Sequence, residues 1–257
     1  MEVKGILKRY IVTPDKHFPY ADNKAIKIVC KAIEILKPDG YIDLGDTGEW
    51  ASVSKWKWKN KAKPNLEYFL PEVIQEVEDV NAGMDIIDES LDKANVKEKH
   101  FCQGNHELWL DYFVESYPYL PEYSCANALG IKERGYHFHR AGDLLTIGGM
   151  SYYHGHSYGG MHHAAAHCKQ YKTNIIYGHH HDIQVYSDKS ADGKIMAYSI
   201  GCLKDMAREK NEFIGGRPLN WGHAFAIVDY VGRKDFFVNV VEIKHGRAII
   251  QGEVIQS

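Results

Sequence analysis

The feature that most constrains this sequence is a short apolar run that ends in a tight polar turn, and it occurs five times. The turns carry Asp, Asn or His, and they are Asp15-Lys16-His17, Gly45-Asp46, Gly104-Asn105-His106, His154-Gly155-His156 and Gly178-His179-His180-His181. A buried strand that delivers a polar side chain at its carboxyl end has this pattern, and in an open α/β sheet such ends meet at one crevice. Converging carboxylate and imidazole groups suit divalent transition metals. The sequence therefore predicts a hydrolytic site with two metal ions.

The composition favours a single domain over residues 1–257. Hydrophobic residues make up 44% of the chain and charged residues 25%, which are ordinary globular values. The net charge of -3 gives no global basic field, so nucleic-acid binding would need a local basic patch. Five cysteines without a Cys-x-x-Cys pair argue against a disulfide framework, and no run approaches the roughly 18 apolar residues of a membrane span. We expect a cytoplasmic protein with no membrane partner.

The order of the elements indicates an α/β fold. Apolar residues recur at helical spacing over 22–37, Pro38 follows that run, and 41–44 reads as a buried strand. A strand, a helix and a second strand in this order are typical of a parallel sheet. The pattern continues with strands expected over 99–103, 144–153 and 173–178 and with helices expected from about 106 and over 161–170. Later runs at 195–200, 223–231, 236–243 and 248–255 follow closely and favour an antiparallel second sheet.

Residues 47–99 interrupt this rhythm, and we interpret them as an insertion over the site. A Lys/Trp stretch extends to about residue 63, and helical spacing follows over 67–93. Five lysines and two tryptophans between Lys55 and Lys63 provide cations and aromatic faces, which suit phosphate contact and base stacking. The alternative is a solvated lobe whose two Trp side chains pack onto the helices of the insertion.

Two-metal chemistry explains why these residue types occur together. A carboxylate oxygen can bridge two ions about 3.5 to 4 Å apart, and Asp46 is the natural bridge. Such a pair lowers the pKa of a shared water and stabilises the charge of an in-line displacement. The leaving group still needs a proton, and His106 beside Asn105 is our candidate donor because imidazole titrates near neutrality.

The ordered motifs Asp-x-His, Gly-Asp, Gly-Asn-His-Glu, His and Gly-His-x-His closely resemble the calcineurin-like metallophosphoesterase family between residues 15 and 181. The resemblance implies a β-sandwich of two mixed sheets flanked by α-helices, with a helical insertion here. It also implies that His106 acts on the phosphate or the leaving group. One metal would be held by Asp15, His17, Asp46 and His181, and the other by Asp46, Asn105, His154 and His179. The segment Trp221 to Phe225 is similar to bacteriophage-type members.

The sequence departs from that family at one position. The family has Gly-Asp-x-x-Asp, but Glu49 occupies the second acidic position here. That residue supports the site in the family, so the longer side chain leaves the orientation of His106 open.

Several other residues near the motifs have competing interpretations. His156 competes with His154 as the ligand of the fourth motif, and we expect it to face substrate together with Asn105 and His106. His163 and His167 are spaced i, i+4 on an expected helix and could bind a metal, but a solvated helix face is the favoured interpretation. A structural hydrogen-bonding role is expected for Asp43, which lies inside a strand.

The predicted activity is hydrolysis of phosphodiester or phosphomonoester bonds by metal-activated hydroxide, with nucleotides or nucleic acid as candidate substrates. A phosphomonoesterase acting on phosphoproteins or small metabolites is the main alternative. A catalytically silent nucleic-acid-binding scaffold is disfavoured because every expected ligand position is filled. A structural zinc site is disfavoured because such sites are rich in Cys. The expected cofactor is a pair of divalent ions, Mn first, with Fe, Zn, Co or Ni as alternatives.

Overall fold

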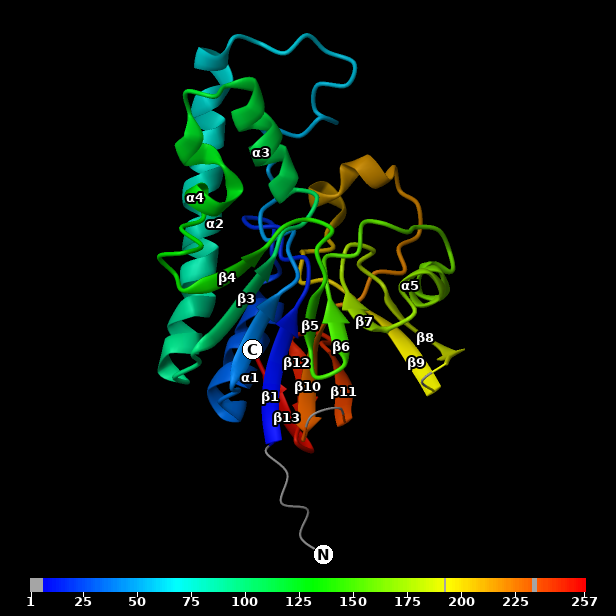
Figure 1. Cartoon of the computed structure of the whole chain (residues 1–257). Coiled ribbons are helices and arrows are strands. Elements are labelled where there is room, and N and C mark those ends of the chain that lie inside the picture. The colour runs from blue at the N-terminus through cyan, green and yellow to red at the C-terminus, as the bar shows by residue number, and fades with distance from the viewer. Residues whose placement is uncertain (1–6, 192, 233–234) are drawn as a thin grey trace, which may run out of the picture.

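The computed structural model describes residues 7–191, 193–232 and 235–257. Two mixed β-sheets pack face to face, and helices cover the outer face of each sheet (Figure 1). This arrangement confirms the predicted fold class. Within the described ranges, none of the helices combines the length and apolar character that crossing a bilayer requires.

The first sheet has six strands in the order β11-β10-β1-β2-β3-β4. Their bounds are β1 Leu7–Thr13, β2 Gly40–Asp43, β3 Glu98–Cys102, β4 Tyr136–His139, β10 Ala224–Val231 and β11 Asp235–Glu242. Strands β1 to β4 are parallel, and β10 pairs antiparallel with both β1 and β11. The carboxyl ends of β1, β2 and β3 therefore meet at one edge of the sheet, as the first three polar turns require.

The second sheet has five strands in the order β5-β6-β7-β9-β8. Their bounds are β5 Leu145–Ile147, β6 Met150–Tyr152, β7 Asn174–Tyr177, β8 Ile183–Ser190 and β9 Gly193–Ile200. The strands β6, β7 and β9 are parallel, and β5 and β8 are antiparallel edges. A separate hairpin is formed by β12, Arg247–Ile250, and β13, Glu253–Gln256.

Three expectations about these strands are wrong. The late runs do not build an antiparallel second sheet, because β10 and β11 extend the first sheet while β9 pairs parallel with β7. The run 144–153 is not one strand, since Gly148 and Gly149 have φ angles of 52° and 84° and turn the chain between β5 and β6. The run 248–255 is likewise divided, with Gln251 and Gly252 in the turn between β12 and β13.

The helices are α1 Asn23–Leu36, α2 Leu66–Lys93, α3 Glu107–Ser116, α4 Cys125–Ala128 and α5 His163–Tyr171. The side chain of Asp22 caps α1 by accepting hydrogen bonds from the backbone N–H groups of Lys24 and Ala25. The long helix α2 connects the parallel strands β2 and β3 and packs against α1 (Figure 1). The segment 47–99 thus contains a crossover helix in addition to the Lys/Trp stretch.

Alternating side chains of the central strands build two different cores. Ile11, Tyr41 and Phe101 face helices α1 to α4, whereas Val12 and Ile42 face the second sheet. A third cluster packs α5 against the outer face of β7 and β9. Both faces of β2, of most of β7 and of β1 from Tyr10 onward are buried, so the positions of these strands are fixed from both sides.

Candidate metal centre

The polar turns adopt unusual backbone conformations. Asp15, His17, Asp46, His179 and His181 have φ angles of 29°, 54°, 47°, 67° and 63°, in the left-handed region that side-chain-bearing residues rarely adopt. Such residues cost on the order of 1–3 kcal/mol each and cluster at functional sites. Here the left-handed turns direct the side chains of several turns toward one another.

Glycines allow two of these turns to approach each other closely. A Cβ atom on Gly104 would lie 2.2 Å from Asp46 Oδ1, and one on Gly178 would lie 2.0 Å from Asp15 Oδ2. Glycine at both positions is therefore a steric requirement of the site.

The first ligand group combines the turn after β1 with the turn after β7. His17 Nε2 lies 3.1 Å from His181 Nε2, and Asp15 Oδ1 lies 3.4 Å from His181 Nε2. All three side chains are buried, and one candidate ligand atom from each lies within 4.8 Å of the other two. Oδ2 of Asp15 accepts a hydrogen bond from the backbone N–H of His179 at 2.8 Å, so the two turns hold each other in register.

The second group draws on β2, β3, β6 and β7. Nε2 of His154 lies 3.2 Å from Asp46 Oδ2, 3.2 Å from His179 Nδ1 and 2.9 Å from Asn105 Oδ1. Nδ1 of His154 lies 3.0 Å from the carbonyl oxygen of Leu44, which fixes the proton on Nδ1 and turns Nε2 toward the other three groups.

Asp46 lies between the two groups. Its Oδ2 is 3.2 Å from His154 Nε2 in the second group and 4.0 Å from His17 Nε2 in the first. Its Oδ1 accepts a hydrogen bond from the backbone N–H of His106, which fixes the carboxylate plane. This is the placement that a bridging carboxylate requires.

The electrostatics of the second group fit a cation. Several lone pairs point at one small volume, which is unfavourable unless a positive charge is placed there. Burial opposes a charge on His154, yet the Asp46 carboxylate overrides it and raises the pKa of His154 to about 9. Burial, together with the charge on His154, lowers the pKa of His179 to about 3, so its imidazole is neutral and competent as a ligand.

His106 lies at the edge of this centre. Its Nε2 is 3.8 Å from Asp46 Oδ2, and its Nδ1 lies 2.7 Å from the carbonyl oxygen of Glu49. Its ring packs on Trp109 at a centroid distance of 4.0 Å. The orientation of His106, which the sequence left open, is therefore set by the main-chain carbonyl of Glu49. The carboxylate of Glu49 instead lies 2.8 Å from His17 Nδ1.

His156 is half-buried beside the second group. Its ring centroid is 5.7 Å from that of His154 and 6.4 Å from that of His179. Nδ1 of His156 is buried and has no hydrogen-bond partner among the described residues. The structure thus brings all of the sequence-predicted site residues into one neighbourhood, with His156 at its margin.

Two supporting features were missed in the sequence. Glu107 is fully buried, and its carboxylate accepts hydrogen bonds from the backbone N–H groups of Asp46, Thr47, Gly48 and Gly104. It joins the turn after β2 to the turn after β3. The available signal was its place directly after the Gly-Asn-His motif at the start of a helix.

Lys16 is the second supporting residue that was missed in the sequence. It is fully buried, and its Nζ lies 2.8 Å from Asp43 Oδ1. The same oxygen accepts hydrogen bonds from Gly45 N–H and Thr47 Oγ1–H, which confirms the structural role expected for Asp43. A lysine in a polar turn is normally expected at the surface, so nothing in the sequence indicated that Lys16 is buried.

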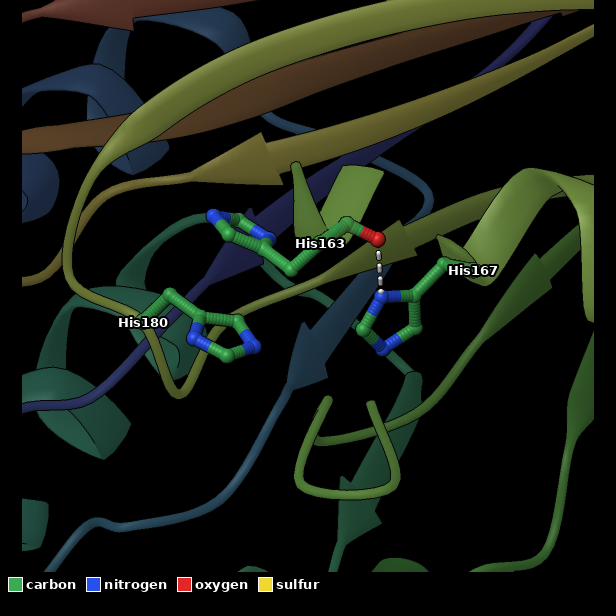
Figure 2. Close-up of side chains that lie close together, drawn as sticks. All are labelled: His163, His167 and His180. Carbon is green, nitrogen blue, oxygen red and sulfur yellow. Dashed lines mark hydrogen bonds between the residues drawn. The ribbon is translucent and has the colours of Figure 1, made fainter. Parts of the chain in front are cut away.

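A further histidine group comprises His163, His167 and His180 (Figure 2), and His180 belongs to the turn after β7. The expectation that the α5 histidines face solvent is wrong, since His163 and His167 are 3% and 0% exposed. The ring nitrogens of His163 face a tyrosine hydroxyl at 2.7 Å and the Asp182 carboxylate at 3.0 Å. Those of His167 face the carbonyl oxygens of His163 and Gly155. These partners fit a hydrogen-bond network joining α5 to the ligand turns better than a third metal site.

No family model matches this sequence. The chain is 23% identical to the Gene 54 protein of Mycobacterium phage L5 over 276 aligned residues, covering 96% of this chain and 98% of that protein. Vps29 from Chaetomium thermophilum has 10% identity and a TM-score of 0.48, over 92% of this chain and 88% of that one. Vps29 from Entamoeba histolytica, solved with Zn²⁺, has 12% identity and a TM-score of 0.45, over 97% of both chains. Function must therefore be argued from the residues of the site itself.

Proposed function

We propose that this protein is a phosphoesterase that uses two divalent metal ions. The observation that carries the proposal is the position of the Asp46 carboxylate between Asp15, His17 and His181 on one side and His154 and His179 on the other. Two neighbouring ligand groups that share one carboxylate are the arrangement expected for a dinuclear hydrolytic site. The amide oxygen of Asn105 completes the second group.

Two ions bound at these groups would supply a nucleophilic hydroxide near neutral pH and stabilise the charge of the transferring phosphoryl group. Residues of the protein would protonate the leaving group and contact the phosphate. The Glu49 carbonyl holds the Nδ1–H of His106 and turns Nε2 toward the site, so the imidazolium form of His106 is placed to donate its Nε2 proton to the leaving oxygen. His156, whose half-buried ring lies beside His154 and His179, is placed to contact a phosphate oxygen.

The ligand set is built from nitrogen and oxygen donors, without thiolates. Such a set suits Mn, with Fe, Zn, Co and Ni as alternatives, and it differs from the Cys-rich sets of structural zinc sites.

Metal analysis followed by assay with bis(p-nitrophenyl) phosphate and p-nitrophenyl phosphate tests the proposal. Asp46→Asn and His179→Ala are expected to lose bound metal and nearly all turnover. His137→Ala is the matched control, because His137 is exposed on the edge strand β4. Full activity in a metal-depleted Asp46→Asn protein would refute the proposal, and metal binding without turnover of any ester would favour a silent scaffold.

One observation favours phosphodiester bonds of single-stranded nucleic acid as the substrate. Trp56 is 60% exposed, and the Nζ atoms of Lys55 and Lys59 lie 5.3 and 4.9 Å from its ring centroid. Trp58, in contrast, is anchored, because its Nε1–H donates to the Ser52 carbonyl and its ring lies near α2. Of these two tryptophans, Trp56 is therefore the one that is available to a base, and stacking of one base contributes about 1–3 kcal/mol.

The triple variant Lys55→Ala/Trp56→Ala/Lys59→Ala tests this substrate. We expect KM for a single-stranded oligonucleotide to rise by about 5- to 150-fold, as loss of one stacked base implies. Hydrolysis of bis(p-nitrophenyl) phosphate should stay unchanged. The control is Lys189→Ala/Lys194→Ala, which removes two exposed lysines from the distant β8–β9 hairpin. Unchanged oligonucleotide kinetics, or a preference for monoesters, would favour the phosphomonoesterase alternative.

A further inference from the structure

A buried chain of charges reaches the first ligand group from a distant part of the sequence. Lys204 is 1% exposed, and its Nζ donates to Glu49 Oε2 at 2.7 Å. The same oxygen lies 2.8 Å from His17 Nδ1. One carboxylate oxygen thus sits between a buried ammonium and the outer nitrogen of a candidate metal ligand.

The backbone holds both ends of this chain in place. Lys204 forms a bridge with Ala21, and its carbonyl oxygen lies 2.8 Å from His223 Nε2. The N–H of Glu49 donates to the Phe18 carbonyl at 3.0 Å. The main chain at both Lys204 and Glu49 is therefore held by neighbouring segments of the fold.

The contact between Glu49 and His17 determines which ring nitrogen of His17 is available to bind a metal. A histidine binds a metal through one ring nitrogen, and a carboxylate at the other nitrogen fixes the tautomer and the ring orientation. With its proton on Nδ1 toward Glu49, His17 presents the Nε2 lone pair to Asp15 and His181. Lys204 compensates the charge of Glu49, which would otherwise add to the two aspartates of the site.

In the second ligand group, no side-chain carboxylate in the part of the chain that the structure describes is placed at the outer nitrogen of His154. His154 Nδ1 is held by the main-chain carbonyl of Leu44, which no side-chain substitution removes. His106 likewise depends on the main-chain carbonyl of Glu49 and not on its carboxylate. Replacing the Glu49 side chain should therefore affect one ligand group and leave the other group and His106 in place.

We propose that Lys204 and Glu49 are a positioning pair that fixes the metal-binding tautomer of His17 and thereby sets the affinity of one of the two metal positions. This inference rests on the proposed function, because it requires that the centre binds two ions. This role differs from the one expected for the second acidic residue of the Gly-Asp-x-x-Asp motif, which concerned the orientation of His106. Here the Glu49 carboxylate contacts the candidate metal ligand His17, and its charge is compensated by Lys204.

Calorimetric titration of the metal-free protein with Mn²⁺ tests the pair. The wild type is expected to show two binding steps, and Glu49→Gln and Lys204→Met are expected to weaken one step by about 10- to 100-fold and leave the other unchanged. Lys99→Met is the matched control, because Lys99 is 8% exposed and pairs with Asp88 away from the site. It removes a comparable buried ammonium, so it should destabilise the fold without changing either step.

Two further measurements keep the test decisive if a variant folds poorly. Long-range ¹H–¹⁵N spectra of the metal-free wild type should show His17 protonated at Nδ1. In the double variant Glu49→Gln/Lys204→Met, which carries no unpaired buried charge, the weakened step should remain weak even if stability recovers. Equal weakening of both steps, no weakening, or a His17 proton on Nε2 would overturn the inference. A wild type that binds fewer than two ions would instead contradict the proposed function, and this inference would fail with it.

Discussion

At the scale of single residues, the site depends on histidines whose outer nitrogens are held by the protein. The Nδ1 atoms of His154 and His106 face the carbonyl oxygens of Leu44 and Glu49, and Nδ1 of His17 lies 2.8 Å from the Glu49 carboxylate. The two carbonyl contacts place a proton on Nδ1 and turn Nε2 toward the centre. A main-chain partner and a side-chain partner have different consequences, because only the second can be removed by substitution.

The role of His106 predicts a dependence on the leaving group. We expect His106→Ala to lower kcat for a phenyl ester by about 10²- to 10⁴-fold, because a poor leaving group needs a proton. The p-nitrophenyl ester should be affected much less, since its leaving group departs as a stable anion. Metal content by elemental analysis should equal that of the wild type, because His106 is a member of neither of the two ligand groups. An equal loss for both esters would contradict proton donation.

The buried pair of Lys16 and Asp43 predicts a loss of stability. Lys16→Met leaves the Asp43 carboxylate buried without its cation, and breaking such a pair costs about 3–5 kcal/mol. Lys16→Met/Asp43→Asn removes both charges and should recover part of that loss. Urea unfolding measures both variants, and Lys189→Ala on the exposed hairpin serves as the control. A single variant as stable as the wild type would show that the pair contributes nothing.

At the scale of elements, α2 sets the position of the first ligand turn. Gly83 of α2 lies against Phe18, the residue after His17, and an added Cβ would lie 2.4 Å from the Phe18 ring. Phe18 in turn donates its N–H to the Thr47 carbonyl. The helix, the turn after β1 and the turn after β2 are therefore packed as one unit.

The substitution Gly83→Ala has two opposing effects on the stability of the fold. Helix propensity favours Ala by about 1 kcal/mol. Overpacking against a buried ring costs about 1–3 kcal/mol, so we expect a net loss of stability in urea unfolding. Metal affinity should fall as well, because the displaced ring is joined to His17. Gln75→Ala, at an exposed position of the same helix, is the control, and a stabilised Gly83→Ala protein would rule out the steric argument.

Most of the elements could be predicted from the sequence, but their pairing could not. Helices α1 and α2 and strands β2, β3 and β7 follow from local periodicity, because burial on one or two faces leaves a pattern in the chain. The assignment of β10 and β11 to the first sheet depends on long-range pairing, which leaves no local pattern. Lys204 illustrates the same limit at the site, since 155 residues separate it from Glu49.

At the scale of the whole molecule, the site lies where the two sheets of the sandwich meet. Asp15 and Asp46 come from the first sheet, whereas His154, His179 and His181 follow strands of the second. Each ligand group contains residues from both sheets. An ion bound at either group would therefore join the two halves of the fold, and metal binding should stabilise the packing of one sheet on the other.

This coupling predicts that the stability of the metal-free protein depends on pH more strongly than that of the metal-loaded protein. In the metal-free protein, burial opposes the charge on His154 but Asp46 raises its pKa to about 9, above the ordinary value of 6.5. A raised folded-state pKa contributes stability that is fully present below pH 6.5 and is lost as the pH rises through about 9. By the linkage relation this loss is about 3 kcal/mol. The neutral histidines do not cancel it, because burial lowers the pKa of His17 to about 4 and that of His179 to about 3, below this window.

Thermal unfolding between pH 6.5 and 9 measures the effect. The chelator-treated protein should lose stability across this range, and the Mn²⁺-loaded protein should not, because the ion takes the place of the His154 proton and binds more tightly as that proton is lost. At a free metal concentration 100 times Kd, the added stability is about 2.7 kcal/mol. Asp46→Asn should show neither the pH dependence nor the response to Mn²⁺. A metal-free protein whose stability rises over this range would mean that His154 is neutral, and that no positive charge is needed between the two sheets.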